Sequence, residues 1–303
     1  FFYLKQKKVL KSFLSVETKF DYDIIHAHTL FSNGDIALKL KMKYGIPYIV
    51  AIRNTDINVF FKYFFFLRKY GLKIMENADK IIFLSPSYKK ECLENYVSIE
   101  KREEIERKVA IIPNGINKFW IENSVTLKKR HKEIRLIYVG SIDKNKNVIT
   151  TISACKKLLS QGYEVKFTVV GDIEIKIDEL NEKFIQHIPY SPKEEIRKYF
   201  EESDIFIMPS RYETFGLVYA EALSQGLPVI YTRGQGFDEQ IPDGEVGHSV
   251  KYDDVDEIVE KITLIYNNYD NYSSKIKNYI HKFDWENIAD NYKIIYENRT
   301  EEY

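Results

Sequence analysis

The sequence predicts an α/β protein of two domains, each with a parallel sheet covered by helices. Short apolar runs alternate along the chain with longer segments of helical periodicity, an order typical of parallel strands joined by helices. With 303 residues, 44% of them hydrophobic, the chain can form two cores. The charged run Lys128–Lys132 lies between the two halves and is typical of a solvated linker.

Strands are expected at the short apolar runs, and helices where apolar residues recur at three- and four-residue spacing. The expected strands are Ile24–Ala27, Tyr48–Ile52, Lys80–Leu84 and Val109–Ile112 in the first half, and Arg135–Val139, Lys166–Val170, Phe184–His187, Ile205–Met208 and Pro228–Tyr231 in the second. The expected helices are Lys5–Val16, Asp35–Tyr44, Phe60–Asn77 and Tyr88–Tyr96, followed by Val148–Gln161, Lys193–Glu202, Leu217–Gln225 and Val255–Asn268. A further helix is expected from Phe283 to Glu297.

The turn between the strand Ile205–Met208 and the helix Leu217–Gln225 is suited to binding a phosphate. That helix ends at Gly226, with Pro228 beyond it. Its N-terminus should present backbone N–H groups and a positive dipole end to an anion, and Gly216 lets the anion approach closely. The N–H groups concerned belong to Thr214, Phe215, Gly216 and Leu217.

Two carboxylates flank this helix start. Glu213 lies just before the helix and Glu221 about two turns inside it. A nucleotide sugar has a matching layout of sugar, diphosphate and ribose diol. The alternative is a solvated helix start, because glutamate is common in first turns for dipole reasons alone.

Several motifs, in order along nearly the whole chain, resemble those of the GT-B glycosyltransferases, in particular the retaining family 4. Glu213 and Glu221 resemble the Glu-x7-Glu signature of that family. The other matching segments are Asp23–His28, Pro113–Asn117, Val139–Lys146, Val169–Asp172 and Ile241–Gly244. The resemblance implies two Rossmann-like domains that face each other across a cleft.

The implied domain division is an acceptor-side domain over residues 1–125 and a donor-binding domain over residues 126–282. The C-terminal helix, residues 283–303, is expected to pack back on the first domain. Family members begin with a strand and a glycine-rich loop, and nothing before Asp21 supplies them. The N-terminal domain is therefore expected to be truncated.

The resemblance also implies an activity, the transfer of a sugar with retention from a nucleoside-diphosphate sugar to a glycan or lipid-linked acceptor. Bacterial capsule or exopolysaccharide synthesis is the expected setting. Glu221 would accept hydrogen bonds from the ribose diol, and Glu213 would hold sugar hydroxyls and orient the donor. Lys146 and the helix N–H groups would stabilise the departing diphosphate. Ser141, after Gly140, stands where the family places an arginine, and Lys144, Arg211 or Arg53 could compensate.

Gly171, Asp172 and Tyr190 are expected to recognise the base of the donor, although an exposed turn is an alternative for Tyr190. The loop Gly234–Glu239 resembles one that lines the cleft, though glycines after a strand also serve as plain turn residues.

In the first domain, one of His26 and His28 is expected to point into the fold by alternation along the strand, and His28, which is closer to the loop, is the expected catalytic-site histidine. A structural histidine is the alternative. Arg53 stands where the family commonly has a histidine, and it could bind phosphate or an anionic acceptor, or pair with Asp56. Asn114 is a further acceptor or phosphate candidate.

Composition excludes several classes of function. The 45 basic and 45 acidic side chains cancel, which gives no reason to expect a nucleic-acid partner. Cys92 and Cys155 have no metal-ligand spacing, so buried free thiols are expected, and neither a metal nor another cofactor is expected. Without an apolar run of about 18 residues, the chain is expected to be cytoplasmic, with possible contact at the inner face of the cell membrane.

The aromatic and basic segment Phe60–Lys69 admits two interpretations, an interfacial contact with an anionic membrane or a core helix with a basic rim. Two alternatives to transfer activity also stay open. One is a GT-B epimerase or hydrolase, for which no additional catalytic acid is present. The other is a non-catalytic nucleotide-sugar-binding subunit, which Ser141, Arg53 and the missing N-terminal units would suit.

Overall fold

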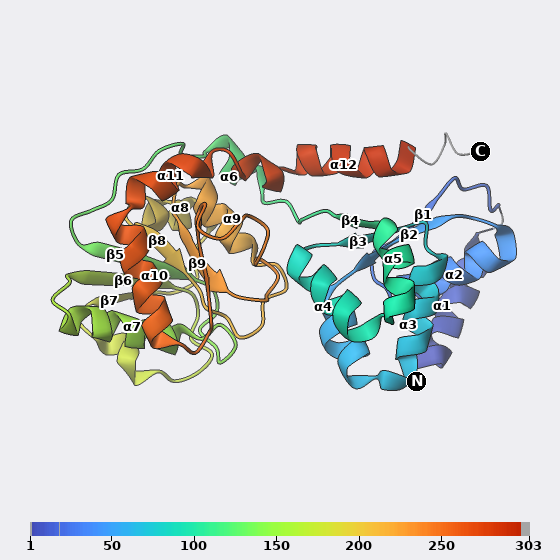
Figure 1. Ribbon diagram of the computed structural model, residues 1–303, viewed down its shortest axis with the longest axis horizontal. Helices are drawn as coiled ribbons and strands as arrows, with labels where there is room; N and C mark the ends of the chain where they lie inside the picture. The colour runs from blue at the N-terminus through green and yellow to red at the C-terminus, as the bar shows by residue number, and fades with distance from the viewer. Residues whose placement is uncertain (1, 18, 298–303) are drawn as a thin grey trace. The chain divides into compact units, whose positions relative to one another are not determined.

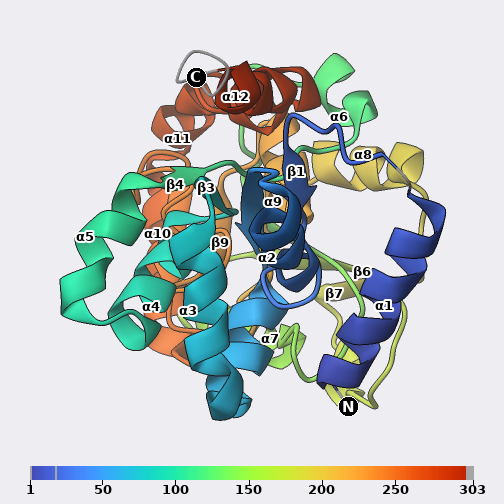
Figure 2. The same cartoon turned by 90° about the vertical axis from the view of Figure 1, so that its right-hand side faces the viewer.

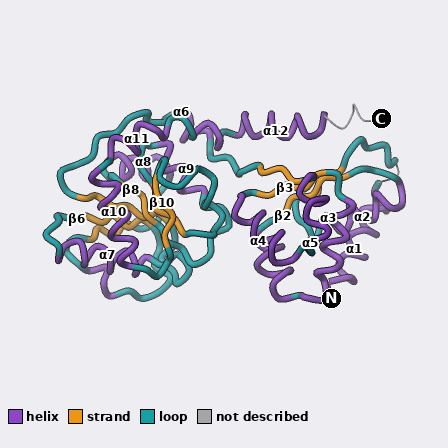
Figure 3. The backbone as a smooth tube through the Cα atoms, viewed as in Figure 1, coloured by secondary structure: helices purple, strands orange, loops and turns teal. Residues whose placement is uncertain are grey.

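The computed structural model describes residues 2–17 and 19–297, and the chain divides into two compact units. The first unit comprises Phe1–Pro113 with Ala289–Tyr303, and the second comprises Asn114–Ile288. Figure 1 labels the elements, and Figure 3 separates helices from strands and loops. The segment 114–125, expected in the first domain, groups with the second unit, because Trp120 packs against Phe200 and the Val125 N–H donates to the Ser224 carbonyl over 2.7 Å.

The first unit contains a parallel four-stranded sheet in the order β1-β2-β3-β4. Every residue of β2 is buried, as expected for a central strand of a parallel sheet. Helix α1 packs beside α2 (Figures 1 and 2). The strands are β1 (Ile25–Ala27), β2 (Tyr48–Ile52), β3 (Lys80–Phe83) and β4 (Val109–Ile111). The helices are α1 (Phe2–Val16), α2 (Asn33–Tyr44), the π-helix η1 (Asp56–Phe61), the 3-10 helix η2 (Phe65–Leu67), α3 (Arg68–Asn77), α4 (Pro86–Tyr96) and α5 (Ile99–Arg107).

The second unit contains a parallel six-stranded sheet in the order β10-β9-β8-β5-β6-β7. Its strands are β5 (Ile134–Val139), β6 (Val165–Val170), β7 (Ile185–Ile188), β8 (Ile205–Ile207), β9 (Val229–Thr232) and β10 (Gly247–Val250). Its helices are α6 (Lys118–Glu122), α7 (Val148–Ser160), η3 (Asp178–Asn181), α8 (Lys193–Glu201), α9 (Leu217–Ser224), α10 (Val255–Asn267), α11 (Tyr269–Ile276) and η4 (Ile280–Phe283). Helix α12 (Trp285–Glu297) begins in this unit and groups with the first unit from Ala289 onward. Since all strands are parallel, the loops that follow them emerge at one edge of the sheet.

The prediction of one helix over Phe60–Asn77 is wrong. The segment forms the end of η1, the short η2 and then α3, and the helical path is interrupted at Phe64, whose φ and ψ are −101° and 60°. Phe60 and Phe61 are neighbours in the chain, yet their rings contact Phe31 at centroid distances of 4.8 and 5.1 Å. The backbone around these two rings therefore departs from the α-helix, in the π-helix η1 and the 3-10 helix η2, where both rings pack against the core.

Sequence periodicity also missed α5, α6, β10 and α11. Ile105 is the only buried residue of the charged helix α5, so its apolar stripe is too sparse to detect. Strand β10 is fully buried although it contains His248 and Ser249, and such polar residues are typical of a loop. The two cysteines are buried free thiols, as expected, and burial raises the pKa of both. Among the described residues, no helix is long and apolar enough to span a bilayer.

Candidate active site

An ion pair lies where the loops after β5 and β8 meet in the second unit. Lys146 Nζ is 2.5 Å from Glu213 Oε2, and the two side chains are only 23% and 9% exposed. Both residues were predicted to contact the same ligand, and the structure brings them together. A lysine held in this way can contact a phosphate and still retain its carboxylate partner.

Backbone and side-chain bonds fix the loop that carries Lys146. Asn145 binds Tyr212 twice, because its Oδ1 accepts from the Tyr212 N–H over 3.0 Å and its Nδ2 donates to the Tyr212 carbonyl over 2.9 Å. The Arg211 N–H donates to the Asn145 carbonyl over 2.8 Å. Asp143 Oδ1 accepts from the Lys146 N–H over 2.7 Å. The two loops therefore form one structural piece before any ligand arrives.

The loop after β9 supports Glu213 from behind. The Glu213 N–H donates to Gln235 Oε1 over 2.9 Å, and the Gly236 N–H donates to the Glu213 carbonyl over 3.0 Å. A Cβ atom at residue 236 would lie 2.0 Å from the Thr214 carbonyl oxygen, so glycine is required for this approach. The loop Gly234–Glu239 thus positions the first carboxylate of the pair of glutamates.

Helix α9 begins at this same place. Gly216 has a φ of +74° and caps the helix, and a Cβ there would lie 2.3 Å from the Tyr219 ring. In the described part of the chain, no acceptor contacts the N–H groups of Thr214, Phe215 and Gly216. Phe215 is buried against Phe237 and Phe283, which fixes the turn. These N–H groups remain available to an anion.

Glu221 lies farther along α9 in a half-buried position. Burial raises the pKa of its carboxyl from 4.5 to about 7, and a hydrogen bond with Trp120 acts in the opposite direction. Trp120 belongs to α6 and is itself buried. A carboxyl with a pKa near neutrality is sensitive to any group that donates hydrogen bonds to it.

The loops after β5 and β6 touch at their glycines. A Cβ at Gly171 would lie 1.9 Å from the Gly140 carbonyl oxygen. Asp172 Oδ1 accepts from the N–H of Tyr190 over 3.0 Å, which joins the loops after β6 and β7. The Tyr190 side chain is 76% exposed. The structure therefore places Gly140, Gly171, Asp172 and Tyr190 along one loop edge.

Ser141 contributes no charge at this edge. Its hydroxyl donates to Asp143 Oδ2 over 3.2 Å, and the Tyr138 hydroxyl donates to its carbonyl over 2.6 Å. Lys144 is exposed, and the Arg211 guanidinium lies 5.5 Å from the centre of the Tyr252 ring.

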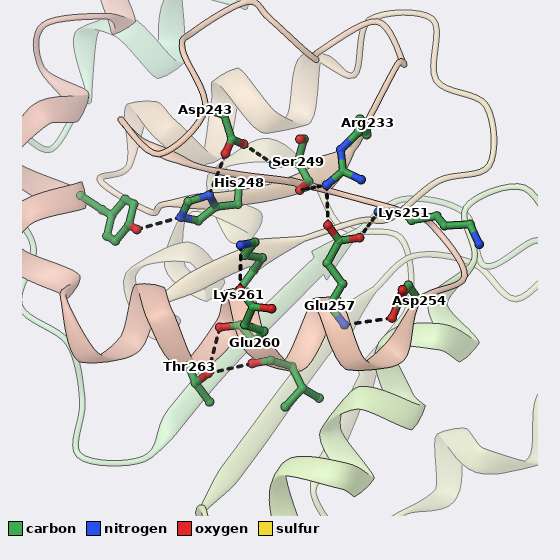
Figure 4. A network of polar contacts seen from close by, with 12 residues as sticks. Arg233, Asp243, His248, Ser249, Lys251, Asp254, Glu257, Glu260, Lys261 and Thr263 are labelled. Carbon is green, nitrogen blue, oxygen red and sulfur yellow. Dashed lines mark hydrogen bonds and ion pairs between the residues drawn. The ribbon is translucent and has the colours of Figure 1, made fainter.

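A polar network behind the β9 loop anchors β9 and β10 to α10 and α11 (Figure 4). His248 contacts Asp243 Oδ2 over 3.0 Å and the Tyr272 hydroxyl over 2.8 Å. Burial raises the pKa of Asp243, but hydrogen bonds from His248 and the Ser249 N–H lower it more, so it lies below its usual value.

The second part of this network joins strand ends to α10. Arg233 pairs with Glu257, whose Oε2 accepts from the Lys251 N–H over 2.8 Å (Figure 4). Glu257 is also tied to Asp254, the N-cap of α10, through its own N–H over 2.9 Å. Arg233 immediately precedes the loop that supports Glu213, so the network holds the start of that loop.

In the first unit, the two histidines lie side by side with ring centroids 4.2 Å apart. The expectation that alternation separates them is wrong, because residues two apart on a strand lie on the same face. His26 is half-buried, and its Nδ1 is 2.8 Å from the Tyr296 hydroxyl. Burial, followed by the nearby His28 and Arg53, lowers the pKa of His26 to about 4. His28 is exposed. Both line a pocket of about 490 Å³ between α1, β1 and α2.

Asp56 organises the loops around His28. Its buried carboxylate accepts from the N–H groups of Leu30, Phe31 and Arg53 over 3.0, 3.2 and 2.9 Å. Burial raises its pKa in spite of these bonds. Arg53 Nε donates to the His28 carbonyl over 3.1 Å, so the guanidinium lies beside the histidine loop.

Asn114, the remaining candidate of the sequence, is the first residue of the second unit and is half-buried. Among the described residues, no group of three or more His, Cys, Asp or Glu side chains could hold a metal ion.

Comparison with known families agrees with this geometry. Residues 121–283 match the family described as Glycosyl transferases group 1, and residues 2–118 match Glycosyltransferase Family 4. The chain is a family 4 glycosyltransferase of the GT-B fold.

Three curated relatives show how far the likeness of this glycosyltransferase extends. An uncharacterized glycosyltransferase of Methanocaldococcus jannaschii is 27% identical over 91% of this chain and 75% of its own length. The alpha-monoglucosyldiacylglycerol synthase of Acholeplasma laidlawii is 26% identical over 78% of this chain and 65% of its own length. The capsular polysaccharide biosynthesis glycosyltransferase CapM of Staphylococcus aureus is 30% identical over 63% of this chain, and the match spans about half, 53%, of that relative.

Solved structures share the fold of the glycosyltransferase. Sucrose-phosphate synthase from Thermosynechococcus elongatus superposes with a TM-score of 0.72 at 20% identity, over 98% of this chain and 79% of the other. Anabaena HepE, solved in complex with UDP, also gives a TM-score of 0.72 at 14% identity, over 97% of this chain and 82% of the other.

Sequence reasoning overlooked several residues that build the site of the glycosyltransferase. Asn145 and Asp143 lie inside the recognised segment Val139–Lys146. The contacts of Asn145 depend on the loop after β8, whereas Asp143 bonds within its own loop. Gln235 lies between two glycines, and that spacing could have indicated a residue in close backbone contact. Trp120 gave no signal, because it lies about a hundred residues before Glu221 on a helix of five residues.

Proposed function

We propose that this glycosyltransferase transfers a sugar, with retention of configuration, from a nucleoside-diphosphate sugar to a glycan or lipid-linked acceptor. The observation that carries the proposal is the Lys146–Glu213 pair beside the open N–H groups of Thr214 to Gly216. HepE, which shares the fold, has been solved with UDP and with UDP-glucose, and this supports a nucleotide-sugar donor. The likeness to CapM supports a role in surface polysaccharide synthesis.

In this proposal the diphosphate occupies the start of α9. The N–H groups of Thr214, Phe215 and Gly216, with that of Leu217, bind its oxygens, and Lys146 supplies the positive charge that stabilises the departing nucleoside diphosphate. Glu213 orients the sugar through its hydroxyls. The short ion pair supports this role, because it fixes the carboxylate beside the phosphate position.

Glu221 accepts hydrogen bonds from both hydroxyls of the ribose, since a carboxylate can receive two hydrogen bonds at once. Gly140, Gly171, Asp172 and Tyr190 surround the base. The Ser141 hydroxyl donates to Asp143 and brings no charge to the donor, so the N–H groups carry a larger share of phosphate recognition than an arginine at this position would leave them.

His28 and Arg53 act on the acceptor side. The exposed His28 imidazole is suited to contact the transferred sugar or the acceptor, and the Arg53 guanidinium beside it is suited to a negatively charged acceptor group. The reaction is proposed to need no metal, because the helix N-terminus and Lys146 take the place of a cation. Asn114 is a further candidate for acceptor or phosphate contact.

The enzyme is proposed to work in the cytoplasm at the inner face of the cell membrane, where lipid-linked acceptors are exposed. The relative from Acholeplasma laidlawii is named as a synthase of a glycolipid, which supports an acceptor at the membrane.

Donor binding is tested by thermal-shift titration with UDP-, GDP-, ADP- and CMP-sugars. Stabilisation by the sugars of one base, lost in Glu221→Ala, is the expected result. Turnover is then followed as release of the nucleoside diphosphate in the presence of EDTA, and the anomeric configuration of the product is read by NMR. Absence of stabilisation by every donor, an inverted product or loss of turnover with EDTA would contradict the corresponding part of the proposal.

A further inference from the structure

One end of the first unit carries a cluster of exposed apolar side chains. Tyr63, Phe64, Phe65 and Phe66 follow one another and are 66%, 38%, 71% and 60% exposed. Tyr3 and Leu4 at the start of α1 are 53% and 66% exposed, and Val59 is 39% exposed. We call these seven side chains the aromatic tip. Contiguous exposed apolar surface of this kind marks an interaction site.

Ring contacts connect the parts of the tip. Phe2 of α1 contacts Phe60 at a centroid distance of 6.0 Å, and Phe60 contacts Phe64 at 5.6 Å. Tyr3 contacts Tyr70 of α3 at 6.0 Å. The start of α1 and the turn before α3 therefore form a continuous surface.

Buried neighbours prevent the exposed rings from folding inward. Phe61 is fully buried and stacks on Tyr96 at a centroid distance of 4.8 Å. Leu67, which follows the four exposed aromatics in the sequence, is also buried. Arg68 Nε donates to the Phe61 carbonyl over 2.6 Å and closes the turn. The core is thus filled by residues that flank Tyr63–Phe66, and these four side chains are held outside it.

The two segments that carry the tip are basic. The segments Phe2–Val16 and Ile57–Met75 contain eight basic residues and no acidic residue, in a chain with equal numbers of both. The eight are Lys5, Lys7, Lys8, Lys11, Lys62, Arg68, Lys69 and Lys73. Lys5, Lys7, Lys8, Lys69 and Lys73 are exposed. Glu91, a neighbouring acid of α4, is partly buried and faces Lys62.

We propose that the aromatic tip binds the surface of a bilayer that contains anionic lipid, with its rings at the boundary between headgroups and acyl chains and the lysines at the lipid phosphates. The inference rests on the membrane contact proposed above and names the surface and lipid chemistry that provide it. Rings with a basic border have the composition that suits this interface. A second copy of the chain fits less well, because a two-fold contact would bring the basic borders together.

The expected affinity changes follow from the side chains. Replacing Phe65 and Phe66 by serine should lower the partitioning of the chain onto vesicles about tenfold per ring. This value takes half of the free energy of transferring a phenylalanine side chain out of water as realised at the interface. Replacing Lys69 and Lys73 by glutamine should lower it about 30-fold in total on anionic vesicles, since each basic residue contributes roughly 1 kcal/mol near such a surface. Neither pair contributes a described contact to the donor site.

The test is co-sedimentation of the full chain with vesicles of phosphatidylglycerol and phosphatidylcholine, and with phosphatidylcholine alone. The expected result is binding to the anionic vesicles that weakens with salt and with either double variant. Ile99→Ser with Leu127→Ser is a matched control, because these side chains are 75% and 59% exposed and neither belongs to the aromatic tip. The control should bind like the unaltered chain.

Donor-induced thermal stabilisation of every variant is measured in parallel, so that failure of membrane binding and failure of donor binding are distinguished. Absence of vesicle binding by the unaltered chain, equal binding to neutral vesicles, or binding unaffected by both double variants would overturn the inference. The inference would also be overturned if the unaltered chain formed a dimer that the Phe65→Ser, Phe66→Ser variant does not form, or if the chain bound a single-stranded oligonucleotide in place of vesicles. If the phenylalanine variant does not fold, the lysine variant still decides the matter.

Discussion

Replacing Glu221 by glutamine should stabilise the ligand-free enzyme at alkaline pH and weaken donor binding. The folded state raises the pKa of this carboxyl from 4.5 to about 7, because half-burial disfavours its charged form. Between these two values the folded chain holds a proton that the unfolded chain has released. Stability from this group is therefore present at low pH and is lost as the pH rises from about 4.5 to 7.

The size of the effect follows from the two pKa values. A difference of 7 − 4.5 = 2.5 pH units corresponds to about 3 kcal/mol, an upper value because the side chain keeps some contact with solvent. Glutamine removes the charge and keeps an oxygen for the contact with Trp120. The gain in the free energy of unfolding of the variant over the unaltered chain should approach this value at pH 8.5. It should be close to zero at pH 4, where glutamate itself is neutral. For a domain of this size, it corresponds to roughly 2–4 °C of melting temperature per kcal/mol.

The assay is thermal unfolding of both proteins at pH 4, 5, 6, 7 and 8.5, with calorimetric donor titration at the same pH values. Glu164→Gln serves as a control, because Glu164 is an exposed residue of the same unit. Donor affinity of the unaltered enzyme should fall as the pH drops below about 7, where the carboxylate proposed to bind the ribose becomes protonated, and the variant should be weak throughout. A stability difference that does not change with pH, or a variant less stable at pH 8.5, would refute the reasoning.

Three further substitutions test the supports of the site. Lys146→Met should abolish measurable turnover and destabilise the second unit by about 1–3 kcal/mol, because it leaves the nearly buried Glu213 carboxylate without its cation; kinetics and urea unfolding check both effects. Gly236→Ala places a methyl group 2.0 Å from the Thr214 carbonyl in the present geometry, so donor titration should show a loss of at least tenfold in affinity, and unchanged binding would contradict the required close approach. Asp56→Ala leaves three backbone N–H groups without their acceptor and should cost about 2–4 kcal/mol in the first unit, seen as faster hydrogen exchange there, while donor stabilisation of the second unit persists.

The sequence predicted the strands of both sheets well because most of them, such as β2 and β8, are short apolar runs between polar turns, although β1 and β7 also contain polar residues. Strand β10 is the exception. Its His248 and Ser249 are buried with their polar groups bonded to Asp243, Tyr272 and the neighbouring strand. Asp243 is only five and six residues away, but no apolar pattern in the sequence marks these contacts. Buried polar residues of this kind are accounted for by tertiary contacts rather than by local pattern.

The same distinction between local pattern and tertiary contacts applies to the candidate site. The strand, turn and helix N-terminus around Glu213 are local features that the sequence predicted, whereas Lys146 was assigned from the resemblance to family 4; the structure places the two side chains together. The residues that hold these groups in place, which form a second layer behind them, could not be predicted from the sequence. Gln235 and Asn145 hold Glu213 and Lys146 in place through contacts across 22 and 67 residues of sequence, and either could be exchanged for another hydrogen-bonding residue without altering any motif.

Ser141 shows how that second layer alters the interpretation of a motif. Seen alone, its replacement of an arginine removes a positive charge from the diphosphate site. In the structure its hydroxyl donates to Asp143, and the same carboxylate receives the Lys146 N–H, so the serine helps to fix the loop that presents the remaining lysine. Since Lys146 already pairs with Glu213, the diphosphate in the proposed binding mode would draw on the N–H groups at the start of α9 for much of its stabilisation. Restoring the cation by Ser141→Arg would add charge to the site, but it would also remove a bond to Asp143, and its effect on donor affinity is the balance of these two terms.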